Sequence, residues 1–459
     1  MKRRGMALVA ATGLLASCAP SLTQPPVASR VAAPLQWRTQ LGSDAAIEAD
    51  WWKAFGDPQL SELVELARAN NTDVAIAAAR VREARAQEQA SRALLLPSLD
   101  FTGQGAESRS LSPFGKPVES LVLQPVFQAS YELDLFGKNR AQIDAAQANA
   151  GAAQAASDAV LLSVTAATAS GYITLLALDQ RIETLRATLA TRGEALRIAR
   201  DRQEAGYTSQ LELRQAEAEY RAAEQQIPAA EAALARQENA LSVLVGEPPR
   251  AIRRGTFAAL GKPAIPLVLP SELTRRRPDI LQAEYALAAS DARMRGARAQ
   301  FLPQIRLAAS AGTIVSSALD DPVAIWSVGG SILAPIFNGG RLQGQFDAAT
   351  AQRDQAAFTY RRTVLTAFRE VEDQLAVISR LNEQEVSLRA QRVAVADAVR
   401  HASNRYRAGY SPYLEQIDAQ RTLLSVDLAL VQLKADNLTA LVALYQALGG
   451  ALQTGGADQ

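Results

Sequence analysis

The sequence predicts an α+β membrane protein with an internal two-fold repeat, in which long coiled-coil helical hairpins alternate with pairs of β-strands. Three observations lead to this prediction. They are an internal duplication, long proline-free stretches rich in helix-forming residues, and short segments in which apolar and polar residues alternate. The duplication indicates the overall plan, the proline-free stretches indicate the hairpins, and the alternating segments indicate the strands.

The duplication is visible in short segments that return at a nearly constant spacing. Asn71-Thr72-Asp73-Val74 returns as Arg277-Pro278-Asp279-Ile280, and Ala205-Gly206-Tyr207 returns as Ala408-Gly409-Tyr410. The repeat length is much greater than that of a solenoid unit, which is about 20–50 residues. The duplication therefore indicates two like halves that complete one structure together. We expect a signal peptide at 1–17, a lipidated N-terminal and equatorial segment at 18–70, structural repeats at 71–260 and 261–450, and a tail at 451–459.

The N-terminus has the layout of a secretory signal. Lys2-Arg3-Arg4 precede an apolar run, Met6 to Ala16, that is too short to span a bilayer as a helix. Leu15-Ala16-Ser17-Cys18 resembles a bacterial lipobox, in which the cysteine is acylated and the chain is cleaved before it. We therefore expect a covalent lipid on Cys18 and no other cofactor; the alternative is a plain signal peptide with an incidental cysteine. Ala19 in place of Asp, by resemblance to bacterial lipoproteins, permits sorting to the outer membrane.

Composition excludes several classes of function. A net charge of +1 and a pI near 7.8 give no basic footprint for nucleic acid. The chain contains one histidine and one cysteine, which excludes most metal sites and nucleophilic mechanisms. His401 lies in a helical run without a second ligand, and no phosphate-binding loop or nucleophile elbow is present. We expect neither an enzyme nor a metalloprotein.

Two long helices are predicted, one in each half. Lys138 to about Glu204 contains no proline, and its leucines and isoleucines keep the 3/4 spacing of a coiled-coil seam. At about 1.5 Å per residue this helix is roughly 100 Å long. The second half repeats it from Leu342 to about Arg407. Gly206 and Gly409 then end these helices, and return helices follow to about Val245 and Leu448, the first of them kinked at Pro228.

Four strands are predicted between the helices. Gln128–Leu135 alternates polar and apolar residues, Ser98–Thr102 and Gln304–Leu307 do the same, and Trp326–Ile336 is a weaker case. Gly/Ser/Pro-rich connections near Ser108–Pro117 and Ser316–Pro322 join them into two pairs. This alternation is typical of transmembrane barrel strands, although a half-buried soluble sheet is the alternative. The barrel is favoured because we expect secretion and a lipid anchor but no membrane-spanning helix. Since four strands cannot close a barrel, the chain must oligomerise.

Several motifs occur together in the order of a known family. They are Trp51–Leu60, Arg276-Arg277-Pro278-Asp279-Ile280, Phe301-Leu302-Pro303 and Ile336–Arg341. In these motifs the chain resembles the TolC-type outer-membrane efflux proteins, and the lipobox makes it similar to their lipoprotein branch, the OprM/NodT-like outer-membrane factors of RND multidrug pumps. The resemblance implies a homotrimer, with four strands per chain in a 12-stranded β-barrel above a periplasmic tunnel of long helices. Trp51 and Trp52 are expected to be ordinary anchors of an N-terminal segment.

The resemblance also implies the function and the partners. The expected protein is a passive exit duct in the outer-membrane lipid, conducting small molecules or drugs that an inner-membrane RND pump and a periplasmic adaptor (membrane fusion protein) deliver. The adaptor is expected to dock at the helical tips, at Gly206, Tyr207, Gly409 and Tyr410. The alternatives are the outer-membrane component of an ABC-type (type I) protein secretion system and a structural coiled-coil lipoprotein. Strand alternation argues against the second alternative, and the lipobox favours drug efflux over protein export.

A periplasmic gate is implied as well. Leu414, Asp418, Arg421 and Tyr406 match positions that form the constriction in the family. Leu414 and Asp418 are four residues apart on one helical face, so three-fold symmetry would place an apolar ring beside an acidic ring. Arg421 would hold Asp418 in a closed arrangement, the alternative being solvated charges on a helix surface. The first half has Leu211 and Gln215 at the matching positions, so an equal contribution from both halves is not expected.

Overall fold

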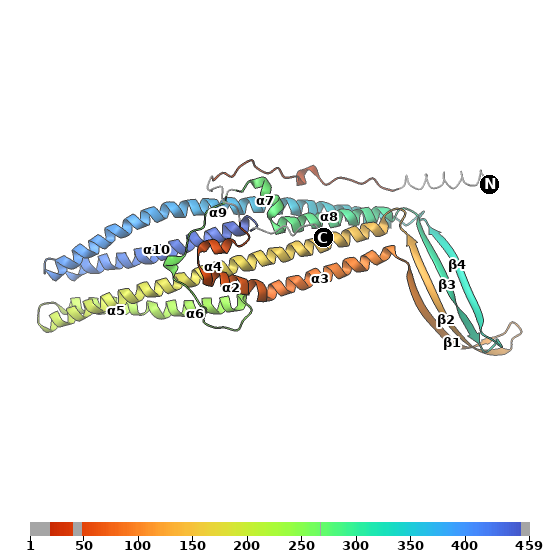
Figure 1. Cartoon of the computed structure of the whole chain (residues 1–459), viewed down its shortest axis with the longest axis horizontal. Coiled ribbons are helices and arrows are strands. Elements are labelled where there is room, and N and C mark those ends of the chain that lie inside the picture. The colour runs from red at the N-terminus through yellow and green to blue at the C-terminus, as the bar shows by residue number, and fades with distance from the viewer. Residues whose placement is uncertain (1–18, 40–47, 267, 451–459) are drawn as a thin grey trace. The chain divides into compact units, whose positions relative to one another are not determined.

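The computed structural model describes residues 19–39, 48–266 and 268–450 and groups the chain into two compact units. The predicted signal peptide, Cys18 and the tail at 451–459 lie outside the described residues. The described helices are α2 Pro58–Asn70, α3 Thr72–Arg92, α4 Lys138–Glu204, α5 Gln210–Glu224, α6 Gln226–Leu244, α7 Pro270–Arg276, α8 Pro278–Ala299, α9 Arg341–Arg407 and α10 Tyr413–Ala447 (Figure 1). The strands are β1 Ser98–Leu111, β2 Pro117–Leu133, β3 Gln304–Ser316 and β4 Val323–Leu333.

The order of these elements repeats along the chain. A helix, two strands and a long helix follow one another from α3 to α4 and again from α8 to α9. Compactness groups the residues differently. Unit 1 comprises Met1–Val31, Ala79–Ala155 and Gln282–Thr363, and unit 2 comprises Ala32–Ala78, Ala156–Leu281 and Val364–Gln459. Each unit therefore takes residues from both repeats, and α4 and α9 contribute to both units.

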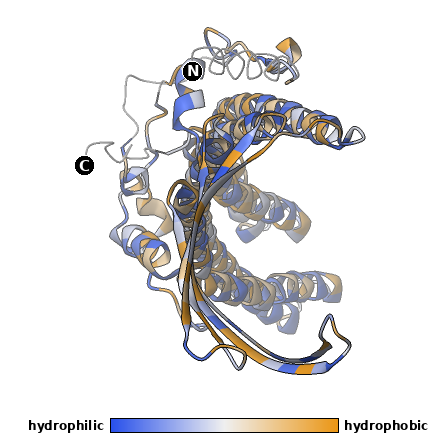
Figure 2. Cartoon of the chain, turned by 90° about the vertical axis from the view of Figure 1, so that its right-hand side faces the viewer, coloured by the Kyte–Doolittle hydropathy of each residue, from blue (hydrophilic) through white to orange (hydrophobic). Residues whose placement is uncertain are grey.

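Unit 1 contains one four-stranded antiparallel sheet in the order β1-β2-β3-β4 (Figure 1). Figure 2 shows that the sheet is curved and carries both hydrophobic and hydrophilic residues. The register pairs Phe101 with Phe127, Phe127 with Ala311, and Ala311 with Trp326, so these residues share one face. Phe101 and Trp326 are 62% and 78% exposed. On the opposite face Ser98 and Ser130 form a hydrogen bond of 2.9 Å, and Ser310 and Ser327 form one of 2.8 Å. The predicted alternation is confirmed, and β2–β3 pairing joins the two predicted strand pairs.

The strand ends differ from the prediction. β2 ends at Leu133 and β4 at Leu333, so Leu135 and Ile336 lie outside the sheet. After β2, the Asp134 carboxylate accepts hydrogen bonds from the backbone amides of Asn139 at 3.0 Å and Arg140 at 2.9 Å, which turns the chain into α4. After β4, Pro335 has no amide hydrogen to continue a ladder. β1, β2 and β3 are also longer than predicted. In β1 the reason is that residues 104–110 are mostly polar and become a strand by pairing with β2.

The long helices agree with the prediction. α4 ends at Glu204 and α9 at Arg407, and each is followed by its predicted glycine turn. The first return helix is divided at Gln225 into α5 and α6. Pro228 accounts for the division, because its ring collides with the carbonyl group four residues earlier, at Glu224. α10 has no internal proline and runs unbroken.

The core of unit 2 is rich in aromatic residues near its N-terminal segment. Trp51, Trp52 and Phe55, in a short 3-10 helix (η2, Trp51–Phe55), are all buried. The Trp51 ring stacks on Tyr445 with centroids 5.2 Å apart. The Tyr172 hydroxyl donates to Asp57 Oδ2 at 2.7 Å. The tryptophans therefore anchor this segment by packing.

Two described helices, α4 and α10, contain an apolar 18-residue window, with mean hydropathy 1.7 and 1.2. Half of each window is buried within the chain. Such windows are weak evidence for a membrane span, and the absence of a spanning helix stays a prediction.

Candidate gate and helical tips

Both helical tips in unit 2 end in the same backbone motif. Gly206 and Gly409 adopt φ of +78° and +80°, the left-handed region in which a side chain is costly. The amide of Tyr207 donates to the Arg202 carbonyl at 2.8 Å, and that of Tyr410 donates to the Arg405 carbonyl at 2.9 Å. These bonds close a Schellman cap on each long helix. The requirement for glycine at both tips was predictable from the sequence.

The tips present apolar surface to solvent. Tyr207 is 84% exposed and Tyr410 is 81% exposed, and both follow directly on the cap glycines. One turn further, Leu211 on α5 and Leu414 on α10 are also exposed. The four predicted docking residues and these two leucines thus form two similar surfaces, one on each hairpin. Adaptor docking at these surfaces stays a prediction.

Tyr406, a predicted gate residue, lies in a small core instead of at an open surface. It is 7% exposed, and its ring centroid lies 5.1 Å from that of the buried Tyr413. Ala199 of α4, Ala216 of α5 and Ile417 of α10 complete the buried cluster. Tyr406 therefore joins the two hairpins from within, a placement that sequence periodicity does not predict.

A hydrogen bond fixes the Tyr406 hydroxyl. It donates to the carboxylate Oε1 of Glu212 on α5, and the Arg202 guanidinium lies 4.8 Å from the centre of the Tyr406 ring. Burial is the main cause that raises the pKa of Tyr406 above its usual value, and the Glu212 carboxylate adds to it. The tyrosine therefore remains a neutral donor at physiological pH.

Arg421 contacts a different carboxylate more closely than the predicted one. Its Nε donates to Oε1 of Glu219 on α5 at 2.8 Å, and its Nη2 donates to the same oxygen. Its Nη1 lies 3.8 Å from Asp418 Oδ1. The predicted pair with Asp418 is therefore present, but the hydrogen bonds go to Glu219. Arg421 thereby links α10 to α5 through Glu219, and it also contacts Asp418 on its own helix.

Glu219 is also paired with a buried arginine of α4. Arg192 Nη1 lies 3.1 Å from Glu219 Oε2 and donates to the Glu219 carbonyl at 2.8 Å. Both side chains are less than a tenth exposed, at 6% and 8%. We define the latch as Arg192, Glu212, Glu219, Tyr406 and Arg421. Only Tyr406 and Arg421 were predicted. The sequence does contain a signal for the other members: Arg192 occupies a position in the apolar seam between Leu189 and Leu196, where a charged residue requires a buried partner.

Leu414 and Asp418 lie on the exposed face of α10. Leu414 is 50% exposed, and the Asp418 side chain is 65% exposed. Both side chains are thus available to a symmetry-related copy, as the predicted rings require. Their role as a constriction stays a prediction.

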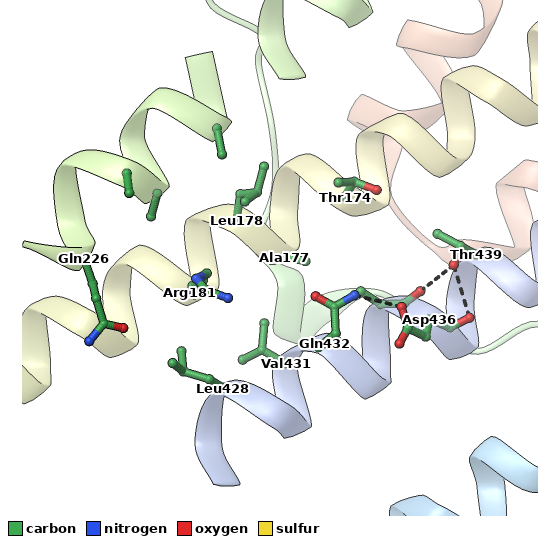
Figure 3. Close-up of a pocket in the computed structure, with 14 residues that line it drawn as sticks. Thr174, Ala177, Leu178, Arg181, Gln226, Leu428, Val431, Gln432, Asp436 and Thr439 are labelled. Carbon is green, nitrogen blue, oxygen red and sulfur yellow. Dashed lines mark hydrogen bonds between the residues drawn. The ribbon is translucent and has the colours of Figure 1, made fainter. Parts of the chain in front are cut away.

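A groove of about 370 Å³ lies among α4, α6 and α10 (Figure 3). Alanines from these helices line it, together with Arg181, Gln226 and Gln432. Gln432 Nε2 donates to the Asp436 carboxylate at 2.8 Å, and Thr439 donates to the Asp436 carbonyl at 3.1 Å. Within the described ranges, no group of three His, Cys, Asp or Glu side chains is placed to hold a metal ion.

Similarity to known proteins covers nearly the whole chain. The family model of the outer membrane efflux proteins matches residues 63–247 and 269–450. The pyoverdine export outer membrane protein OpmQ of Pseudomonas aeruginosa is 34% identical over 99% of this chain and 98% of its own. The toluene efflux pump outer membrane protein TtgC of Pseudomonas putida is 34% identical over 92% of this chain and 89% of its own. The structure of the outer-membrane channel OprN superposes with a TM-score of 0.87, at 28% identity, over 95% of this chain and 99% of its own.

Proposed function

The chain belongs to the outer membrane efflux protein family, and from this premise we propose that it is the passive exit duct of a tripartite pump. An inner-membrane pump of the RND class would supply the energy, and a periplasmic adaptor would connect the pump to the duct. Relatives named for the export of pyoverdine and toluene support small molecules as cargo. No catalytic step is required of this chain, because transport through an open duct follows the substrate gradient.

The sheet of unit 1 is the observation that carries this proposal. One of its faces is lined by exposed apolar side chains, including Leu99, Phe101 and Trp326, as lipid contact requires. Within the described residues β1 and β4 each lack a partner on one side. Unpaired strand edges are not tolerated in lipid. A homotrimer that joins β1 of one copy to β4 of the next would close a 12-stranded barrel with four strands from each chain.

The latch is proposed to hold the periplasmic end closed. It links α9 and α10 to α4 and α5 through two carboxylates, Glu212 and Glu219. Leu414 and Asp418 would then form the constriction around the three-fold axis. Adaptor binding at Tyr207 and Tyr410 would separate the hairpins and break the latch. The contact between Arg421 and Glu219 is the accessible part of the latch, because the Arg421 side chain is 57% exposed, so a docking partner would break it more easily than the buried pair of Arg192 and Glu219.

The N-terminus is proposed to carry a second membrane attachment. Cleavage after residue 17 and acylation of Cys18 would place lipid beside the described segment that begins at Ala19. The chain needs more than one attachment, because a single acyl chain binds a membrane only marginally. The barrel supplies the stronger one.

Deletion of the gene from its native host tests the proposed function. Intracellular ethidium is expected to accumulate several-fold more in the deletion strain, and the wild-type gene is expected to restore efflux. The matched control is Arg380→Gln, which changes an exposed arginine whose single ion-pair partner among the described residues is Glu383 on the same helix, and it should restore efflux fully. Unchanged ethidium levels together with loss of a secreted polypeptide would instead support the protein secretion alternative.

A further inference from the structure

A basic pocket of about 240 Å³ lies in unit 1 where the sheet meets the helices. Phe136 and Gly137, between the end of β2 and the start of α4, form part of its wall. Arg140 of α4 and Arg295 and Arg298 of α8 contribute three guanidinium groups. The single acidic residue of the lining is Asp144. The pocket therefore holds an excess of positive charge.

The partners of the three arginines leave this charge largely uncompensated. Arg295 Nη2 lies 2.9 Å from Asp144 Oδ2, and Arg298 Nε donates to the Pro20 carbonyl at 2.7 Å. In the described part of the chain the Arg140 side chain has neither an ion pair nor a hydrogen bond; only its backbone amide is bonded, to Asp134. Asp134 already caps the α4 N-terminus, so the available positive charge belongs to the side chains.

An apolar rim adjoins the pocket. Phe136 and Leu22, which line it, are 44% and 47% exposed. Ile336 and Phe337 are 81% and 90% exposed just beyond β4. The register places Leu133 opposite Ile305 and Ile305 opposite Ile332, so β2 and β4 end at the same edge of the sheet. At this edge the exposed apolar face of the sheet ends and the helices begin. In the proposed barrel it would lie at the level of the lipid head groups.

We propose that the pocket binds the phosphate group of an anionic phospholipid from the periplasm-facing leaflet of the outer membrane. Guanidinium groups match phosphate oxygens in bidentate geometry, and basic pockets at this level select anionic head groups. The acyl chains would lie along the apolar rim and the exposed face of the sheet. The site depends on the outer-membrane location of the family and not on adaptor docking or on the latch.

Two other occupants share part of this chemistry. Free phosphate matches the arginines but makes no use of Leu22 and Phe136. The lipid proposed on Cys18 would lie near Pro20 and Leu22, but its diacylglycerol group carries no charge to match the arginines. An anionic phospholipid uses both the charge and the rim, so it is the favoured ligand.

Binding of short-chain phosphatidylglycerol to the purified full-length protein in neutral detergent tests the proposal. Native mass spectrometry is expected to show retained phosphatidylglycerol and little phosphatidylcholine at equal concentration. Arg140→Gln with Arg295→Gln should weaken phosphatidylglycerol binding by roughly 25-fold, about fivefold for each arginine. Arg380→Gln, which removes one exposed charge in unit 2, should leave binding unchanged. If the double variant does not assemble, binding to Arg140→Gln alone tests the proposal, because the Arg140 side chain has no partner among the described residues whose loss could disturb folding.

Three outcomes would overturn the proposal. Equal retention of the two lipids would show that charge does not select the ligand. Competition by inorganic phosphate at the concentration of the lipid would identify a simple anion site. Tight phosphatidylglycerol binding in Cys18→Ser but not in the acylated protein would show that the chain's own lipid fills the pocket. None of these results bears on ethidium efflux, so failure here is distinguishable from failure of the exit-duct function.

Discussion

Arg421 on α10 and Arg192 on α4 share one carboxylate, that of Glu219 on α5. Arg421 Nε lies 2.8 Å from Oε1, and Arg192 Nη1 lies 3.1 Å from Oε2. Each arginine uses a different oxygen of the same group, so Glu219 joins three helices at one point. Asp418 is a more distant partner of Arg421, at 3.8 Å.

Glu219→Gln is expected to weaken the closed tip more than any change at Asp418. The substitution leaves buried Arg192 without a full counter-charge, a loss of about 3–5 kcal/mol for a broken buried pair. Asp418→Asn removes only an exposed contact, about 0–1 kcal/mol. Resting conductance in planar bilayers should therefore rise strongly in Glu219→Gln and little in Asp418→Asn. Equal conductance in the wild type and Glu219→Gln would show that the latch does not hold the closed state.

The constriction is tested by Leu414→Ala and Asp418→Ala. Leu414→Ala should raise the conductance by widening an apolar ring, and Asp418→Ala should lower the cation preference because an acidic ring selects cations. Reversal potentials in a salt gradient measure the preference. Wild-type conductance and selectivity in both variants would move the constriction elsewhere and leave these residues as an ordinary helix face.

Replacing the tip glycines by valine should weaken adaptor docking. At φ of +78° and +80°, a β-branched residue costs roughly 1–2 kcal/mol at each site. Crosslinking to the adaptor and drug resistance should both fall in Gly206→Val with Gly409→Val, while the trimer stays assembled. Gly344→Val is the matched control, since Gly344 lies in α9 and an added Cβ there meets nothing within 4 Å. Full crosslinking in the double variant would exclude the tips as the docking surface.

Alkaline pH should open the latch. Burial raises the pKa of Tyr413 to about 12, with a further contribution from Glu219, and burial and Glu212 raise the pKa of Tyr406. Because these folded-state values exceed the unfolded value of about 10, the stabilisation is complete below pH 10 and is lost as pH rises through the folded-state values. Conductance should increase above pH 10. Tyr406→Phe, which already lacks the hydrogen bond, should show raised conductance at pH 8 and a smaller alkaline increase; an alkaline increase equal to that of the wild type would contradict this assignment.

Cys18→Ser should abolish acylation without abolishing conduction. Metabolic labelling with palmitate should mark the wild type and leave the variant unlabelled. Any trimer that the variant inserts should conduct normally, because the barrel also holds the protein in the membrane. Label retained by the variant would exclude Cys18 as the acylation site.

The sequence alone was sufficient for the family, the duplicated plan, the outer-membrane location and the role as an efflux channel, all of which are confirmed. It was sufficient for the ends of α4 and α9 and for both glycine caps as well. These features are local or periodic: a missing proline, a 3/4 seam, a two-residue alternation and a glycine at a helix end are each read from neighbouring residues.

Only the tertiary structure decided which charged residues meet. Arg421 lies three residues from Asp418 in the chain, so the sequence favours that pair, yet the hydrogen bonds reach Glu219 on another helix. Tertiary contacts also decided two other features. The polar half of β1 is a strand because it pairs with β2. Tyr406 is buried because it lies where four helices pack together. Hydrophobic periodicity predicts which face of a helix is buried. The rotation and stagger that bring a particular carboxylate within 3 Å of a guanidinium depend on side-chain packing across helices, which spacing along one chain does not encode.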